Sequence, residues 1–302
     1  MTLYDQSRKP DEFFLITHFL SRRLAYPLAL LFRRLGFSAN AVSILGGLCW
    51  VASVPLIILA GWLLRSGPAR WGWAALLGAA LLWNAGYILD VADGSLARMT
   101  DSASASGFYL DFSFHLLFNT MYLASLGIFL YMLTCNPLYA VLAALSPCCN
   151  WGLSFAAKEH VLCEDIAKGR YRAGRLPPEE EGRIFIDSVK TKQTIGEKRG
   201  ALRTLRHLAE ELICFPGQFT LFGFVVLGDL ALRRLLPRPL LLLKFAFVAV
   251  TGAMLLRVPF RLRREFRTLR RYDELTREQP PPAVGRGGAG GGRRSDDPRE
   301  RW

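Results

Sequence analysis

Long apolar stretches alternate along the chain with short polar and basic ones. Six stretches each approach the roughly 20 residues that a helix needs to cross about 30 Å of hydrocarbon. The first four contain no Asp, Glu, Lys or Arg, and the last two contain one charged residue each, Asp229 and Lys244. Because lipid offers no partners to backbone N–H and C=O groups, the pattern predicts an all-α integral membrane protein with six transmembrane helices. Their approximate bounds are Ala41–Leu64, Trp71–Leu89, Phe112–Thr134, Pro137–Ala157, Leu212–Leu232 and Pro239–Leu256.

The segment before the first predicted span has a different pattern, because arginines recur among its apolar residues. Residues 1–12 are polar, and residues 13–38 form the mixed segment. Such a mixture is typical of an amphipathic helix that lies on the membrane surface with its arginines toward anionic head groups. A soluble cap helix is the alternative interpretation. The arginines concerned are Arg22, Arg23, Arg33 and Arg34.

Composition and charge predict how the protein is oriented in the membrane. The 302 residues are 51% hydrophobic, a share that some soluble proteins approach. The distribution of hydrophobic residues along the chain is therefore more informative about the class of protein than their total. The segregation of apolar and basic residues excludes a disordered chain, a secreted disulfide scaffold and an ordinary soluble enzyme. With six spans and a cytoplasmic N-terminus, 32 of the 38 basic residues lie on the cytoplasmic side. The positive-inside rule therefore predicts that both termini are cytoplasmic, in the cell membrane if the source is bacterial.

These features divide the chain into four parts. Residues 1–12 and the interfacial helix 13–38 precede a six-span domain at 39–260, and a basic, disordered tail is predicted at 261–302. Within the domain, the polar segments 90–115 and 158–211 are expected on the cytoplasmic side. The net charge of +13 is then expected to mark that side of the membrane, and no nucleic-acid partner is predicted.

Three aspartates and a histidine lie where the second predicted span ends and the third begins. Asp90 and Asp93 are three residues apart, and Asp111 and His115 are four apart, so a helix places each pair on one face. If the two helix ends meet, the carboxylates repel one another unless a cation lies between them. Carboxylate oxygens suit Mg²⁺ or Mn²⁺, which in enzymes hold substrate phosphates and neutralise charge in the transition state.

Small residues and an arginine complete this stretch. Gly94 and Ala97 leave room for a ligand or a helix to approach closely, and Gly107 permits tight packing of the next helix. Arg98 could grip a phosphate oxygen. A solvated loop with scattered acids is the alternative interpretation, but the spacing is far more specific than such a loop requires.

At these positions the chain resembles the CDP-alcohol phosphotransferase family, whose signature is D-x2-D-G-x2-A-R-x8-G-x3-D-x3-D. The stretch from Gly36 to Gly46 is similar to the Pro-Asn-x-x-Thr region that opens the family's first span, and the matching layout runs from about residue 13 to 260. Seven of the eight signature positions are in register: Asp90, Asp93, Gly94, Ala97, Arg98, Gly107 and Asp111.

The resemblance implies an activity in phospholipid biosynthesis. A CDP-linked donor, CDP-diacylglycerol or a CDP-headgroup, would give a phosphoryl-linked unit to an alcohol acceptor and release CMP. The resemblance also implies a homodimer and two divalent ions, Mg²⁺ or Mn²⁺, on the donor pyrophosphate. The implied metal ligands are Asp90, Asp93 and Asp111. The nucleotide-diphosphate site would be shaped by Gly94, Ala97, Arg98 and Gly107.

The eighth signature position carries His115 instead of the family's last aspartate, which is its proposed general base and a possible ligand of the second ion. His115 could be the base, since imidazole can accept a proton and can also ligate Mn²⁺. It could instead serve another acceptor or donor in a modified site, or mark a site that binds nucleotide and turns over poorly. The seven intact positions favour an active site, so His115 and Asp111 are the predicted catalytic residues.

The basic loop 158–211 is the predicted place for the acceptor. Lys158, Arg170 and Arg172 are the candidate acceptor residues, although a solvated face against anionic lipid explains the same charges. Family members with phosphorylated-polyol acceptors often read Ser-Tyr-x-x-Ala-Arg at the end of the fourth span. The sequence at 154–159, Ser-Phe-Ala-Ala-Lys-Glu, has no arginine there, which disfavours such an acceptor.

Two other functions compete with the transferase. A catalytically weak homologue could bind a CDP-lipid and act in regulation or as a scaffold. A small transporter would explain six spans with intramembrane charges such as Asp229 and Lys244, which could pair across helices. The transporter is disfavoured because the acids cluster at one membrane face in a phosphotransfer register.

Overall fold

Helices are the only regular elements in the described part of the chain. A computed structural model describes residues 4, 7, 15–102, 104–149, 204–205, 208–209, 211–212, 217–233, 235 and 240–278. The helices are the π-helical turn η1 (Thr17–Ser21), α2 (Arg22–Arg34), α3 (Ala39–Ser66), α4 (Ala69–Met99), α5 (Ala105–Thr134), α6 (Pro137–Leu145), the 3-10 turn η2 (Ser146–Cys149), α10 (Gly217–Ala231) and α11 (Leu241–Glu278).

Four helices are long and apolar enough to cross a membrane. They are α3, α4, residues Tyr109–Thr134 of α5 and residues Leu241–Arg264 of α11. The predicted fourth and fifth spans correspond to shorter apolar helices, Pro137–Cys148 and Gly217–Ala231. Residues 150–157 and 213–216 of those two spans lie outside the described residues. A helical membrane protein is therefore supported by four apolar helices, and the six-span count stays a prediction.

Polar residues between the apolar runs fix where the helices begin. The Ser38 side chain accepts a hydrogen bond from the N–H of Ala41 at the start of α3, and Asn136 accepts one from Leu138 at the start of α6. The start of α11 is capped from a neighbouring helix. Both carboxylate oxygens of Asp229, on α10, accept hydrogen bonds from the first backbone N–H groups of α11, at 3.0 and 2.8 Å. The structure thus gives Asp229, within the predicted fifth span, a capping role.

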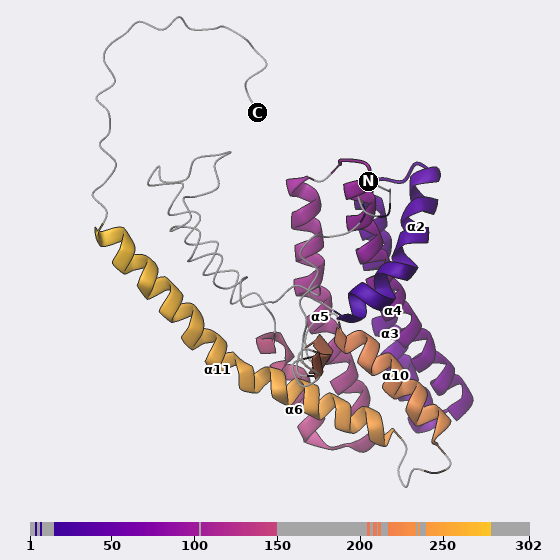
Figure 1. Cartoon of the computed structure of the whole chain (residues 1–302). Coiled ribbons are helices and arrows are strands. Elements are labelled where there is room, and N and C mark those ends of the chain that lie inside the picture. The colour runs from indigo at the N-terminus through magenta and orange to yellow at the C-terminus, as the bar shows by residue number, and fades with distance from the viewer. Residues whose placement is uncertain are drawn as a thin grey trace, which may run out of the picture.

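The helices α3, α4 and α5 form the centre of the bundle. α4 packs against α2, α3 and α10, while α5 packs against α3 and α6 (Figure 1). α11 contacts α10, α6 and η2 near its start, and its far half, drawn in yellow, runs away from the other labelled helices. Because the connections between α3, α4, α5 and α6 are short, consecutive helices run in opposite directions, and the start of α3, the end of α4 and the start of α5 share one end of the bundle.

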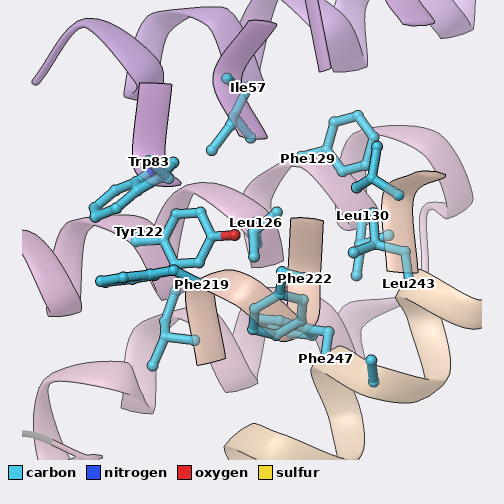
Figure 2. Close-up of a cluster of buried hydrophobic side chains, with 14 of the residues drawn as sticks. Ile57, Trp83, Tyr122, Leu126, Phe129, Leu130, Phe219, Phe222, Leu243 and Phe247 are labelled. Atoms are coloured by element: carbon cyan, nitrogen blue, oxygen red, sulfur yellow. The ribbon is translucent and has the colours of Figure 1, made fainter. Parts of the chain in front are cut away.

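An aromatic core joins α3, α4, α5 and α10. The ring of Trp83 lies 4.1 Å from that of Tyr122 and 4.6 Å from that of Phe219, centroid to centroid. Figure 2 shows these three rings facing one another, with Phe222 and Phe247 further along the same cluster. The backbone oxygen of Trp83 accepts a hydrogen bond from the Trp50 indole. This core fixes the relative positions of the helices that carry the acidic residues.

Two glycines allow α3 and α4 to approach closely. A Cβ atom added to Gly86 would lie 2.5 Å from Nε1 of Trp50 and 2.9 Å from the backbone oxygen of Gly46. A Cβ on Gly46 would in turn lie 3.1 Å from the backbone oxygen of Gly86. Small residues at such crossings are typical of helix pairs in membranes, where close backbone packing replaces the hydrophobic effect.

Replacement of Gly86 by alanine is expected to destabilise the protein by about 1–3 kcal/mol, because the added methyl group overpacks the α3–α4 contact. Thermal unfolding in detergent, followed by the loss of monodisperse protein, measures this effect. Gly78→Ala is the matched control on the same helix, since its Cβ would meet only the end of Leu56 at 3.7 Å. Equal melting temperatures for the two variants would contradict the assigned packing.

Within the segment 13–38, predicted as an interfacial helix, residues 15–34 are helical, and Arg22, expected to face lipid head groups, is buried instead. Residues 15 and 16 are already helical, and α2 buries Ala25 and Ala29 while it exposes Leu24 and Leu31. The Thr17 hydroxyl hydrogen-bonds the phenol of Tyr87, on α4. The turn η1 is therefore attached to the bundle, and the location of this helix on the membrane surface stays a prediction.

The predicted boundary of the tail is wrong. Residues 261–278 are not disordered but continue α11 to Glu278. Arginine, leucine and glutamate are good helix formers, and the Pro- and Gly-rich composition that ends a helix begins only after Gln279. Residues 279–302 and most of residues 1–14 lie outside the described part of the chain.

Candidate functional site

The predicted acidic cluster forms where the end of α4 meets the start of α5. A short turn after Met99 reverses the chain, and Ser104 caps α5 by accepting a hydrogen bond from the N–H of Gly107 at 3.1 Å. The cap satisfies a backbone donor at the start of the helix and fixes where α5 begins. The two helix ends are thereby side by side, as the spacing of the acids predicted.

Three side chains of this cluster form a group suited to a cation. Nε2 of His115 lies 2.9 Å from Oδ1 of Asp90 and 3.1 Å from Oδ1 of Asp111. One ligand atom from each residue lies within 4.8 Å of the other two. The side chains are 31%, 17% and 40% exposed for His115, Asp90 and Asp111, so solutes can reach them. We call these three residues the cation trio.

The donor atoms of the cation trio fit a divalent metal ion. Two carboxylate oxygens carry negative charge on neighbouring helices, and an imidazole nitrogen lies between them. Oxygen-rich sets suit Mg²⁺ and Mn²⁺, and the nitrogen is better matched to Mn²⁺. The structure therefore brings together three of the four predicted ligands in a group that could hold a metal ion.

Asp93, the fourth predicted ligand, lies outside the cation trio. Its side chain is buried, with 7% exposed, and it accepts a hydrogen bond from the hydroxyl of Ser43 on α3. A buried carboxylate needs such a partner, because its desolvation is costly. Asp93 thus faces α3, whereas the cation trio lies between α4 and α5.

A cavity of about 200 Å³ opens beside the cation trio. Its walls come from α3, α4, the turn and α5, and they contain every signature position in register except Asp90. Asp111 belongs to both the cavity and the cation trio, so a ligand in the cavity would contact a cation held by the trio. The lining residues are Ala39, Asn40, Ser43, Asp93, Gly94, Ala97, Arg98, Ser102, Ser104, Gly107 and Asp111.

The glycines predicted to leave room lie where side chains would narrow the cavity. A Cβ on Gly107 would lie 3.0 Å from Oδ1 of Asn40 and 3.2 Å from the hydroxyl of Ser104. A Cβ on Gly94 would lie 3.4 Å from a terminal nitrogen of Arg98. Both contacts are with polar atoms of the lining, so these glycines keep polar groups accessible to a ligand.

Arg98 lies at the edge of the cavity and is anchored by the N-terminal segment. Its Nε donates a hydrogen bond of 2.9 Å to the backbone oxygen of Ser7, which also accepts a longer one, 3.4 Å, from Arg22. The anchor orients the guanidinium group toward the cavity wall that contains Gly94. An arginine held in this way is suited to contact a phosphate oxygen.

Two functional neighbours were not predicted from the sequence. The ring of Trp50 lies 6.2 Å from that of His115, centroid to centroid, so the imidazole borders the aromatic core. One helical turn beyond His115, the buried Asn119 accepts a hydrogen bond from Gln218 of α10. Asn119 could have been noticed as a polar residue inside an apolar run of the sequence. The sequence around Trp50 has no feature that indicates its position beside His115.

The predicted acceptor residues cannot be placed. Lys158, Arg170 and Arg172 lie outside the described residues, as does most of the 158–211 loop. Its last residue, Glu211, is buried, and its carboxylate accepts hydrogen bonds of 2.8 and 2.7 Å from the backbone N–H groups of Leu15 and Ile16. The end of the loop therefore contacts the start of the N-terminal helix.

Comparisons with protein-family models and with curated proteins add no relative to this description. No family model matches the chain, and no curated protein matches it. The chemistry of the site therefore has to be inferred from its own side chains.

Proposed function

We propose that the protein is an integral-membrane CDP-alcohol phosphotransferase. It moves a phospho-alcohol or phosphatidyl unit from a CDP-linked donor to an alcohol acceptor and releases CMP. One observation carries this proposal: six of the seven signature residues in register line a single cavity, and one of them, Asp111, is shared with the cation trio, which holds the seventh, Asp90.

The reaction forms one phosphorus–oxygen bond and breaks another. The hydroxyl oxygen of the acceptor attacks the donor phosphorus that carries the transferred unit. The bond from this phosphorus to the bridging oxygen of the pyrophosphate breaks, and CMP leaves with that oxygen. A divalent ion, Mg²⁺ or Mn²⁺, would neutralise the charge that develops on the phosphates. Asp90 and Asp111 would hold the first ion, and Asp93 with Asp111 is the pair available to a second.

His115 is the general base in this proposal. Its Nε2 is within hydrogen-bond distance of carboxylates on two helices, which fixes the ring at the edge of the cavity. Once those carboxylate oxygens bind a cation, they no longer require the imidazole as a partner. The nitrogen is then available to take the proton of the acceptor hydroxyl.

The remaining residues of the cavity position the donor. Arg98 contacts a donor phosphate, and Gly94, Ala97 and Gly107 leave the space that the nucleotide diphosphate requires. Six spans, cytoplasmic termini and a cytoplasmic site complete the proposal, since a water-soluble nucleotide must reach the cavity. A homodimer engaged in phospholipid biosynthesis, in the cell membrane if the source is bacterial, is the proposed setting.

One observation favours a second candidate, a homologue that binds CDP-lipid with little turnover. The imidazole nitrogen of His115 lies 2.9 and 3.1 Å from oxygens of the two carboxylates that would otherwise attract a cation. A site stabilised in this way could bind a nucleotide without catalysis. Tight binding of a CDP-ligand with no CMP release from any acceptor would favour this candidate.

Lipid mass spectrometry of cells with and without the protein tests the proposal and identifies the alcohol. Cells that express the wild type are expected to contain a phosphodiester lipid that is missing from cells with Asp111→Asn at equal expression. The new head group names the acceptor and the product together. Identical lipid compositions for the wild type and Asp111→Asn would contradict a synthetic role.

Ser43 is expected to matter because it supports the buried Asp93. Ser43→Ala removes a hydrogen bond to a charged group, worth about 1.5–3 kcal/mol, so CMP release should fall roughly 10- to 100-fold. Ser53→Ala is the matched control, since the buried Ser53 hydroxyl bonds only its own helix, at the backbone oxygen of Trp50. If the two variants have equal activity, Ser43 has no role in positioning Asp93.

A further inference from the structure

The far half of α11 combines strong positive charge with exposed apolar side chains. Between residues 257 and 270 the sequence has one acidic residue, Glu265, and six basic ones. This segment runs away from the other labelled helices (Figure 1). Phe260 and Phe266 are 73% and 70% exposed. The basic residues are Arg257, Arg261, Arg263, Arg264, Arg267 and Arg270.

Most apolar residues of this segment lie on a different face from the arginines. Val258, Leu262, Phe266 and Leu269 recur at spacings of four, four and three residues, which places them on one stripe of a helix. At 100° per residue the arginines fall on the remaining surface, with Phe260 among them. A stripe of this kind is typical of a helix that lies in the boundary between water and lipid.

Pro259 lies where the apolar run of α11 gives way to the basic segment. Its ring nitrogen has no hydrogen to donate within the helix, so the helix can bend at this point more easily than elsewhere. Pro259 lies within the candidate membrane span Leu241–Arg264, and the end of that range, residues 257–264, contains four arginines. The basic segment thus begins where that span must leave the hydrocarbon.

We propose that residues 257–270 of α11 bind the anionic surface of the membrane that the same helix enters. The arginines contact lipid phosphates, and the apolar stripe inserts at the level of the head groups. A membrane is favoured over RNA or an acidic protein because only a lipid surface accommodates both faces at once. RNA or an acidic partner would engage the arginines and leave Phe266 and Leu262 exposed to water.

Amide hydrogen exchange of the full-length protein in nanodiscs tests this proposal. Peptides that cover 257–270 are expected to exchange several-fold more slowly in nanodiscs that contain phosphatidylglycerol than in phosphatidylcholine alone. High salt should remove the difference, because it screens the attraction between arginines and phosphates. The quadruple variant Arg263→Gln, Arg264→Gln, Arg267→Gln and Arg270→Gln should lose it at low salt.

A second quadruple variant, Arg286→Gln, Arg293→Gln, Arg294→Gln and Arg299→Gln, has the same net charge and should keep the lipid-dependent difference. Unchanged exchange in α3 and α5 shows that both variants are folded. Equal exchange of the wild type in the two lipids would overturn the proposal, as would protection by added RNA that phosphatidylglycerol does not give. CMP release is not the readout, so this outcome is independent of the proposed activity.

Discussion

Asp111→Asn is expected to abolish both cation binding and CMP release. Asp111 is the residue shared by the cation trio and the cavity, so its charge acts on the ion and on the donor. Asparagine keeps the shape of the side chain and removes the negative charge. Because a bound metal ion contributes several kcal/mol to the stabilisation of a phosphoryl transition state, turnover should fall by roughly 10³-fold or more.

Mn²⁺ binding to the purified protein, followed by electron paramagnetic resonance, measures the first effect without any substrate. Asp101→Asn is the matched control, because Asp101 is an exposed acid in the turn between α4 and α5 and lines neither the cavity nor the cation trio. The control should bind Mn²⁺ and release CMP like the wild type. Wild-type Mn²⁺ affinity in Asp111→Asn would exclude the trio as the metal site.

His115→Ala is expected to lower CMP release by about 10²- to 10⁴-fold, the range over which a positioned general base contributes. The imidazole is the one group of the cation trio that can accept a proton and still leave two carboxylates for an ion. The rate of CMP release at saturating donor and acceptor measures the loss, since removal of a base acts on the chemical step more than on binding.

His115→Asp separates a base from a merely structural ring. Aspartate can accept a proton and ligate a cation, and the resemblance stated above places an aspartate at this position. Activity of His115→Asp should equal or exceed that of the wild type. If His115→Ala keeps full turnover, His115 has no part in the reaction, and the base must be another residue.

The apolar pattern predicted the helices that carry the site because their stabilisation is local. Runs without charged residues mark α3, α4 and α5, and the capping residues Ser38 and Ser104 lie at the starts of α3 and α5. Helical spacing then placed Asp111 and His115 on one face, which the ion-pair distances confirm. The metal group was predictable for the same reason, since it needs only two helix ends joined by a short turn.

Contacts between distant segments were not predictable. The hydrogen bond between Ser43 and Asp93 joins residues 50 apart, and the contact between Arg98 and Ser7 joins residues 91 apart. Neither pair has a local pattern that marks it, because both arise from the packing of three helices and the N-terminal segment. This is why Asp93 was predicted as a metal ligand beside the others, whereas it bonds Ser43 of α3 and lies outside the cation trio.

Charged residues inside or beside apolar runs were the least predictable. A pair between Asp229 and Lys244 across two helices was considered, but the Asp229 carboxylate caps α11 through backbone N–H groups. The arginines from Arg261 onward were assigned to a basic, disordered tail, whereas those up to Arg277 continue the same helix. In both cases the charged residues were evident from the sequence. Their roles depend on the backbone conformation around them, which the sequence pattern did not predict.

Release of CMP by the wild-type protein in proteoliposomes tests the central claim most directly. CDP-diacylglycerol and a CDP-headgroup are each supplied as donor, with Mg²⁺ or Mn²⁺ and a panel of alcohols. The account predicts that one combination yields CMP and a new phosphodiester in equal amounts, and that both products require the ion, the acceptor and Asp111. Donor binding without CMP release for every alcohol, or CMP release that persists after chelation of the ion, would contradict it.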